Sequence, residues 1–268
     1  MNHNIPPTIL IFDSGVGGLS VFYEIQKVLP HANYIYVFDD MGYPYGELAP
    51  DILIERVNEM LRYVVDLHRV DIVVIGCNTA STIVLPSLRE FLSVPVVGVV
   101  PAIKPASLIS NTAVGLIATP ATVKREYTHN LIRDYLLDVP IKLLGTTELV
   151  DMAENKLKGK PVCLVSLQRV LQPLIGKIDV AVLGCTHFPL LRNEIKHVFG
   201  NEIRIIDSGE AIARRVQSLI NNSYIARAKN NNRKCIAYNS APTIEGALNI
   251  TFKKMGFEAI ERIPTQDV

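Results

Sequence analysis

The sequence predicts an α/β protein made of two similar, doubly wound α/β domains with mainly parallel sheets. Short uninterrupted runs of β-branched residues alternate with longer segments of helical periodicity, a pattern typical of parallel strands buried on both faces. Two stretches share one pattern: Asp71–Ser81 reads DIVVIGCNTAS and Asp179–Pro189 reads DVAVLGCTHFP. Ile11–Gly15 (IFDSG) and Ile205–Gly209 (IIDSG) form a second similar pair. The two pairs together favour two related halves.

The first half should alternate strands with helices, which implies a parallel sheet. Its connections are the glycine-rich turn Asp13–Gly18 and the loop Met41–Pro50, and Pro86 predicts a kink or a boundary in the third helix. The expected strands are Thr8–Phe12, Tyr34–Phe38, Ile72–Ile75 and Val96–Val100, and the expected helices are Leu19–Leu29, Asp51–His68 and about Thr79–Leu92.

The pattern restarts at Pro101. The expected strands are Ala113–Ala118, Ile141–Leu144, Val180–Leu183, Ile203–Ile206, Lys234–Tyr238 and an edge strand Ala259–Ile263. The expected helices are Val123–Leu137 after the entry turn Thr119–Thr122, then Thr147–Asn155, Leu164–Leu174, Leu190–Phe199, a helix ending near Asn222, and Thr243–Met255. Asn221–Asn232 is polar and should be exposed. Because the tail should return to the first half, we predict two domains, residues 1–100 plus 207–268 and residues 101–206.

Composition narrows the class of protein. The 268 residues are 49% hydrophobic and 20% charged, as in a globular protein with a large core. The formal net charge of +1 gives no reason to expect nucleic acid or a membrane surface as a partner. No apolar run reaches the roughly 18 residues of a membrane helix, and the first residues do not resemble a signal peptide. The four cysteines lack metal-site spacing, so we expect free thiols in the cytoplasm.

Cys77 and Cys185 each follow a predicted strand where a helix should begin. In parallel sheets ligands bind at this carboxyl edge, and Asn78-Thr79 and Thr186 could cap the two helices. One such cysteine is more often a core residue, but two matched corners favour one active site in the cleft between pseudo-two-fold related domains. Two thiols, one ionised and one protonated, could move a proton between opposite faces of a carbon atom, and helix N-termini lower thiol pKa values.

Four blocks of the sequence resemble the signature blocks of glutamate racemase, a member of the cofactor-independent aspartate/glutamate racemases. They are Asp13–Leu19, Pro44–Gly46, Gly76–Ser81 and Gly184–His187, and Ala118–Thr122 and Pro95–Pro101 extend the match along almost the whole chain. The resemblance implies that the protein interconverts L- and D-glutamate without pyridoxal phosphate, a metal ion or any other cofactor. It also implies that the protein supplies D-glutamate for peptidoglycan and so contributes to cell-wall synthesis and cell shape. By the same resemblance, it would be a homodimer in the cytoplasm.

The resemblance also implies roles for single residues. Cys77 would remove the α-proton of D-glutamate and Cys185 that of L-glutamate, with Asp13 and His187 assisting the thiols. The residues that would bind the amino acid are Asp13, Ser14, Tyr45, Gly46, Asn78, Thr79, Thr186 and His187.

Three of these residues have a simpler alternative. Asp13 could merely cap a helix, His187 could be a packing histidine, and Tyr45 could lie in a surface turn. Cys163 and Cys235 have no matched partner, so we expect them to be structural or incidental. Glu148 should make a favourable contact with the start of its own helix.

Three other functions remain open on the sequence alone. Gly15–Ser20 half-matches a dinucleotide-binding motif with Asp39 at the end of the next strand, although Ser20 stands where the third glycine would be. A thiol hydrolase or transferase would use a cysteine–histidine pair and leave one thiol without a role. A two-lobed periplasmic-type binding protein would need an export signal.

Overall fold

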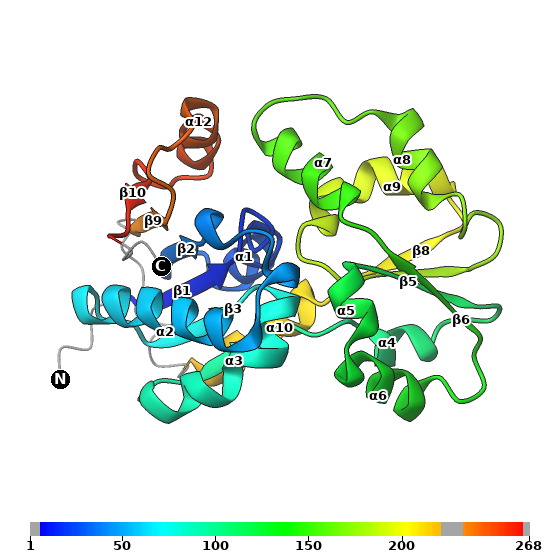
Figure 1. Ribbon diagram of the computed structural model, residues 1–268, viewed down its shortest axis with the longest axis horizontal. Helices are drawn as coiled ribbons and strands as arrows, with labels where there is room; N and C mark the ends of the chain where they lie inside the picture. Colours follow the sequence, from blue (N-terminus) through cyan, green and yellow to red (C-terminus); the bar gives the residue numbers. More distant parts are fainter. Residues whose placement is uncertain (1–5, 221–232, 265–268) are drawn as a thin grey trace. The chain divides into compact units, whose positions relative to one another are not determined.

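The computed structural model describes residues 6–220 and 233–264. The chain forms two compact units: unit 1 comprises residues 1–99 and 209–268, and unit 2 comprises residues 100–208. Each unit is an α/β fold built on one sheet whose paired strands all run parallel (Figure 1), so the predicted fold class is confirmed.

Unit 1 holds a six-stranded sheet in the order β10-β9-β2-β1-β3-β4. The strands are β1 (Thr8–Asp13), β2 (Asn33–Phe38), β3 (Ile72–Ile75), β4 (Val96–Gly98), β9 (Cys235–Asn239) and β10 (Glu261–Arg262). The helices are α1 (Leu19–Val28), α2 (Pro50–Leu67), α3 (Asn78–Phe91), α10 (Gly209–Leu219) and α12 (Gly246–Lys254), with the short 3₁₀ helices η1 (Asp40–Gly42) and η2 (Tyr45–Glu47) after β2. The C-terminal strand β9 therefore pairs with β2, and β10 is the predicted edge strand.

Both faces of this sheet are buried. Side chains alternate along a strand, so Leu10 and Phe12 of β1 pack in the core formed with α2 and α3. On the opposite face of the sheet, the ring of Tyr36 in β2 packs edge-on against Phe252 of α12, with 5.6 Å between the ring centroids. Layers on both faces fix β1 in place and hold Asp13, its last residue, at the carboxyl edge.

Unit 2 holds a four-stranded sheet in the order β6-β5-β7-β8. Its strands are β5 (Val114–Ala118), β6 (Ile141–Gly145), β7 (Val180–Leu183) and β8 (Arg204–Ile206). Its helices are α4 (Ile103–Ser107), α5 (Pro120–Lys124), α6 (Glu126–Tyr135), α7 (Glu148–Leu157), α8 (Leu164–Leu171) and α9 (Arg192–Phe199), and η3 (Phe188–Leu191) is a 3₁₀ helix. The strand order repeats that of β2-β1-β3-β4, so β5 corresponds to β1 and β7 to β3.

This repeated order explains one of the two sequence pairs and overturns the other. Asp71 accepts a hydrogen bond from the Thr8 amide (2.9 Å), and Asp179 accepts one from the Ala113 amide (3.1 Å). Each aspartate thus ties the start of the third strand to the start of the first. The Asp-Ser-Gly of residues 207–209 follows the fourth strand, β8, rather than the first. That pair therefore does not mark equivalent positions, although the two similar α/β halves that it was taken to indicate are present.

The predicted helix Val123–Leu137 is in fact two helices, α5 and α6, that meet at Arg125. The hydroxyl group of buried Thr128 donates to the Thr122 carbonyl at 2.7 Å. A side-chain donor of this kind competes with the helical hydrogen-bond ladder, which accounts for the break.

Other differences from prediction are local. The short helix α4 was not predicted; it follows Pro101, where the pattern restarts. Pro86 does not interrupt α3. The helix predicted at Leu190–Phe199 begins as η3 and continues as α9. The polar stretch 221–232 and the predicted helix end near Asn222 lie outside the described residues.

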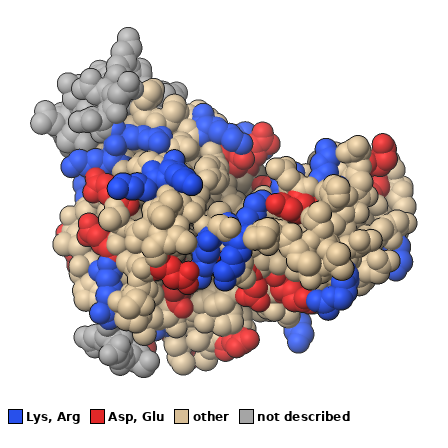
Figure 2. Space-filling view, turned by 90° about the horizontal axis from the view of Figure 1, so that it is seen from above, with Lys and Arg blue, Asp and Glu red and all other residues tan. Residues whose placement is uncertain are grey.

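The face shown in Figure 2 carries both basic and acidic side chains, in keeping with the near-balanced total charge. Within the described part of the chain, no helix is both long enough and apolar enough to cross a membrane.

Candidate active site

The first Gly-Cys corner brings Cys77 to the carboxyl edge of the unit 1 sheet. The Gly76 amide donates to the Phe12 carbonyl at 2.6 Å, and a Cβ at Gly76 would lie 3.3 Å from that oxygen. Cys77 follows as the N-cap of α3 and is 6% exposed. Asn78 and Thr79 therefore occupy the first turn of α3 instead of capping it, which corrects the prediction. The N–H groups of a first helical turn favour negative charge nearby.

Ser14 connects Cys77 to Asp13. The Ser14 hydroxyl lies 3.7 Å from the Cys77 sulfur and 3.2 Å from Asp13 Oδ1, and the Ser14 amide donates to the same carboxylate oxygen at 2.6 Å. Asp13 is fully buried. Gly18, not Asp13, occupies the N-cap of α1, so the simple capping alternative for Asp13 is wrong.

Tyr45 is a buried residue rather than part of a surface turn. It is 2% exposed and shares a core cluster with Phe12 and Cys77, and its hydroxyl donates to Asp39 Oδ2 at 2.8 Å. Gly46 is the next residue of η2. Unit 1 thus brings together the predicted residues Asp13, Ser14, Tyr45 and Cys77, with Asn78 and Thr79 at the start of α3.

Asp39 is a polar residue of this edge that the sequence analysis considered only for nucleotide binding. Its carboxylate is fully buried and accepts from Arg56 Nε at 2.9 Å and Nη2 at 2.7 Å, in addition to Tyr45. A ribose-binding carboxylate has to face the ligand with free lone pairs. Because its oxygens already accept hydrogen bonds from Tyr45 and Arg56, Asp39 argues against the dinucleotide-binding alternative.

The second Gly-Cys corner has the same construction in unit 2. The Gly184 amide donates to the Ile117 carbonyl at 2.7 Å, and a Cβ at Gly184 would lie 3.1 Å from that of Ala118. Cys185 is 8% exposed. His187 is the N-cap of η3, so Thr186, which is buried, does not cap a helix as predicted.

His187 links Cys185 to a glutamate that the sequence analysis missed. Its Nδ1 lies 3.8 Å from the Cys185 sulfur and its Nε2 lies 2.8 Å from Glu154 Oε1. Burial alone would lower the pKa of His187, but its hydrogen bonds and charge interactions with Cys185 and Glu154 raise the pKa well above the usual value. His187 therefore connects the Cys185 sulfur to the carboxylate of Glu154.

Glu154 left one signal in the sequence. It follows the buried residue Val150 by four positions on α7, and residues four apart share a helix face. An acidic side chain in line with a buried face needs a partner, and here the partner is His187.

The other two cysteines and Glu148 belong to other segments of the chain than the two Gly-Cys corners. Cys163 is exposed at the N-cap of α8, and Cys235 is buried in β9. Glu148 does lie in the first turn of α7 and also pairs with Arg169. Among residues 6–220 and 233–264 no three His, Cys, Asp or Glu side chains gather as metal ligands would.

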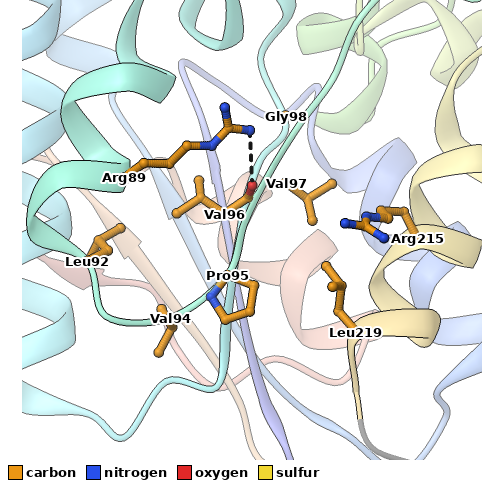
Figure 3. A pocket seen from close by; sticks show the side chains of 9 residues that line it. All are labelled: Arg89, Leu92, Val94, Pro95, Val96, Val97, Gly98, Arg215 and Leu219. Atoms are coloured by element: carbon orange, nitrogen blue, oxygen red, sulfur yellow. Dashed lines mark hydrogen bonds between the residues drawn. The ribbon is translucent and has the colours of Figure 1, made fainter.

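Unit 1 also has a pocket of about 470 Å³ that contains none of the predicted site residues. Figure 3 shows Arg89 of α3 and Arg215 of α10 on opposite sides of it, with β4 between them. Its lining residues are Arg89, Leu92, Val94, Pro95, Val96, Val97, Gly98, Arg215 and Leu219.

Comparison with known proteins gives a consistent result. Residues 20–216 match the Asp/Glu/Hydantoin racemase family. The glutamate racemase of Vibrio campbellii is 57% identical over 258 residues, which cover 96% of each chain. The glutamate racemase of Vibrio parahaemolyticus is 58% identical over 94% of this chain and 93% of its own. The crystal structure of Escherichia coli glutamate racemase with L-glutamate and the activator UDP-MurNAc-ala superposes with a TM-score of 0.89 at 44% identity, covering 96% of this chain and 98% of that one.

The geometry around His187 generates a first prediction. Glu154→Gln removes a negative charge 2.8 Å from the imidazole, so the pKa of His187 should fall relative to the wild type. Titration of the imidazole signals by NMR measures this change. Glu194→Gln is the matched control, because Glu194 pairs with Lys156 and its loss should leave the His187 pKa unchanged. An unaltered pKa in Glu154→Gln would contradict the assigned hydrogen bond.

Proposed function

The chain belongs to the glutamate racemases of the Asp/Glu/hydantoin racemase family, and from this premise we propose that Cys77 and Cys185 are the two bases that interconvert L- and D-glutamate. The observation that supports this proposal is the repeated corner. The two sheets have the same strand order, and one cysteine lies at the carboxyl edge of each. Each cysteine directly follows a glycine whose amide donates a hydrogen bond to the neighbouring strand.

Racemisation requires removal of the α-proton from one face of the carbon and delivery of a proton to the other face. In the proposed reaction the thiolate of one cysteine takes the proton, and the C–H electron pair stays on the α-carbon. The thiol of the other cysteine then gives its proton to the opposite face. The product leaves with inverted configuration, and the two sulfur atoms have exchanged protonation states. From the family resemblance, Cys77 acts on D-glutamate and Cys185 on L-glutamate.

The groups beside the two thiols support their proposed roles. The imidazole of His187, whose pKa is raised by its interactions with Cys185 and Glu154, lies 3.8 Å from the Cys185 sulfur. Ser14, held by Asp13, can exchange a hydrogen bond with Cys77 at 3.7 Å. A cysteine–histidine hydrolase would use only Cys185 and His187, and the Cys77 corner would then have no role.

We further propose that polar groups at the same edges bind the amino acid. The backbone N–H groups at the start of α3, with the Asn78 and Thr79 side chains, suit a carboxylate. Ser14, Tyr45, Gly46 and Thr186 complete the set, with Asp13 and His187 also within reach of the ammonium and carboxylate groups in this proposal. The reaction so described draws on no group other than the side chains and backbone of the chain.

The family resemblance extends the proposal to the cellular role. D-glutamate made by this chain would enter peptidoglycan, and the enzyme would act in the cytoplasm as a homodimer. The cellular role, the location and the homodimer rest on the family resemblance, because the structure is that of a single chain.

The two-base proposal makes a direct mutational prediction. Cys77→Ala and Cys185→Ala should each lower kcat for racemisation, followed by circular dichroism, by at least about 100-fold, because one proton-transfer group is lost. Cys163→Ala removes an exposed thiol that belongs to neither corner and should retain wild-type activity. Retained activity in either of the first two variants would refute the assignment of that cysteine.

The pocket of unit 1 supports a second proposal, about regulation. The E. coli structure contains an activator with a diphosphate group, and guanidinium groups bind phosphate by paired charge-assisted hydrogen bonds. Arg89 and Arg215 line the pocket from two sides (Figure 3). We propose that this chain is also activated by UDP-MurNAc-Ala, bound there.

In this proposal UDP-MurNAc-Ala raises the racemase activity of the wild type. Arg215→Ala should raise the concentration needed for half-maximal activation about tenfold, through loss of a charge-assisted contact, without changing activity in the absence of the activator. Arg214→Ala, a neighbour on α10 that pairs with Glu210, is the matched control and should behave as the wild type. Equal activation of Arg215→Ala and the wild type would exclude this pocket.

A further inference from the structure

The segment that carries Tyr45 and Gly46 is held by one buried carboxylate. Asp39 Oδ1 accepts from the Gly42 amide at 3.2 Å, from Arg56 Nη2 at 2.7 Å and from the Ser240 hydroxyl at 2.6 Å. Its Oδ2 accepts from the Tyr45 hydroxyl at 2.8 Å and from Arg56 Nε at 2.9 Å. Both oxygens are thus fully engaged, and the side chain is completely shielded from solvent.

Asp39 is held in its ionised form. Burial raises the pKa of a carboxyl group, but the hydrogen bonds from Arg56, Ser240 and Tyr45 outweigh burial and lower the pKa of Asp39 below its usual value. A buried charge of this kind requires each donor that surrounds it. The loss of one donor should therefore disturb the others, including the hydroxyl of Tyr45.

Ser240 connects this carboxylate to the C-terminal part of the chain. Besides donating to Asp39, its hydroxyl accepts from the Met41 amide at 3.0 Å, and its own amide donates to the Phe38 carbonyl at 3.3 Å. The adjacent Asn239 donates to Asp40 Oδ2 at 2.9 Å. Ser240 is fully buried and Asn239 is 1% exposed. The end of β9 thus contacts each residue from Phe38 to Met41.

The other end of the network lies beside the Cys77 corner. Tyr45 packs near Phe12, with 6.3 Å between ring centroids, and η2 packs against α3. Tyr45 and Cys77 belong to one core cluster. A continuous set of hydrogen bonds and packed side chains therefore leads from Ser240, through Asp39 and Tyr45, to the start of α3.

We propose that Ser240 is a positioning residue for glutamate binding, which it supports through Asp39 and the Met41 amide without touching the substrate. This inference rests on the proposed function, in which Tyr45 and Gly46 bind the amino acid. One hydroxyl fixes both the carboxylate that holds Tyr45 and the backbone that precedes it. Because the segment binds either enantiomer and carries neither thiol, its displacement weakens binding in both directions and leaves proton transfer largely intact.

The test compares steady-state kinetics of the full-length wild type and Ser240→Ala with each enantiomer, at a temperature where both are folded by circular dichroism. KM should rise about tenfold for L- and D-glutamate alike, as expected for loss of a hydrogen bond to a charged group, while kcat stays within about twofold to threefold. Ser240→Thr restores the hydroxyl, so its KM should lie closer to the wild-type value.

Ser87→Ala is the matched control. The Ser87 hydroxyl accepts from Asn58 Nδ2 at 2.7 Å between α2 and α3, so its loss should lower stability without a change in KM. A wild-type KM in Ser240→Ala, or a fall in kcat alone, would overturn the positioning role. If Ser240→Ala does not fold, Ser240→Cys, which nearly keeps the size of the side chain but replaces the hydroxyl by a weak donor and acceptor, decides on the same criterion. A wild type that does not racemise glutamate would instead refute the proposed function.

Discussion

The position of each thiol depends on how closely a glycine approaches the neighbouring strand. Gly76 and Gly184 donate to the carbonyls of Phe12 and Ile117 at 2.6 and 2.7 Å. A Cβ at Gly184 would lie 3.1 Å from the Cβ of Ala118 and 3.3 Å from the Ile117 carbonyl oxygen, so the neighbouring strand would have to shift by a few tenths of an ångström to admit it. The glycine lets the third strand lie flush with the first to its very end. The next residue, a cysteine, then emerges at the carboxyl edge, where a parallel sheet presents its ligand-binding groups.

The two corners share this backbone but surround their sulfur atoms differently. Cys77 lies at the start of an α-helix beside Ser14 and Asp13, whereas Cys185 lies beside the imidazole of His187, whose pKa is raised by its interactions with Cys185 and Glu154. A racemase needs two groups that act on opposite faces of one carbon and alternate between acid and base. In the proposed mechanism each unit supplies one such group, and the unequal surroundings suit two substrates of opposite configuration.

The sequence could predict what is encoded locally. β-branched runs located the strands. The Gly-Cys pairs located both corners because the same motif ends two similar strands, whereas a single cysteine at a strand end is more often a core residue. Contacts between distant segments could not be read this way. The partner of Glu154 could be identified only once α7 was placed against η3, and the contacts of Ser240 only once β9 was placed beside β2. The Asp-Ser-Gly pair misled for a related reason: a short motif does not reveal which strand of the sheet it follows. The break at Arg125 depended on the partner chosen by a single hydroxyl group, that of Thr128.

The central claim is that two separate bases serve the two faces of glutamate. The most direct measurement is the position of the label in the first turnovers of L-glutamate in deuterated water, read by mass spectrometry after separation of the enantiomers. The two-base account predicts that newly formed D-glutamate carries deuterium at the α-carbon while the remaining L-glutamate does not, with the mirror-image result from D-glutamate. Formation of D-glutamate that retains its original α-hydrogen would contradict it, because a single base would then have returned the same proton.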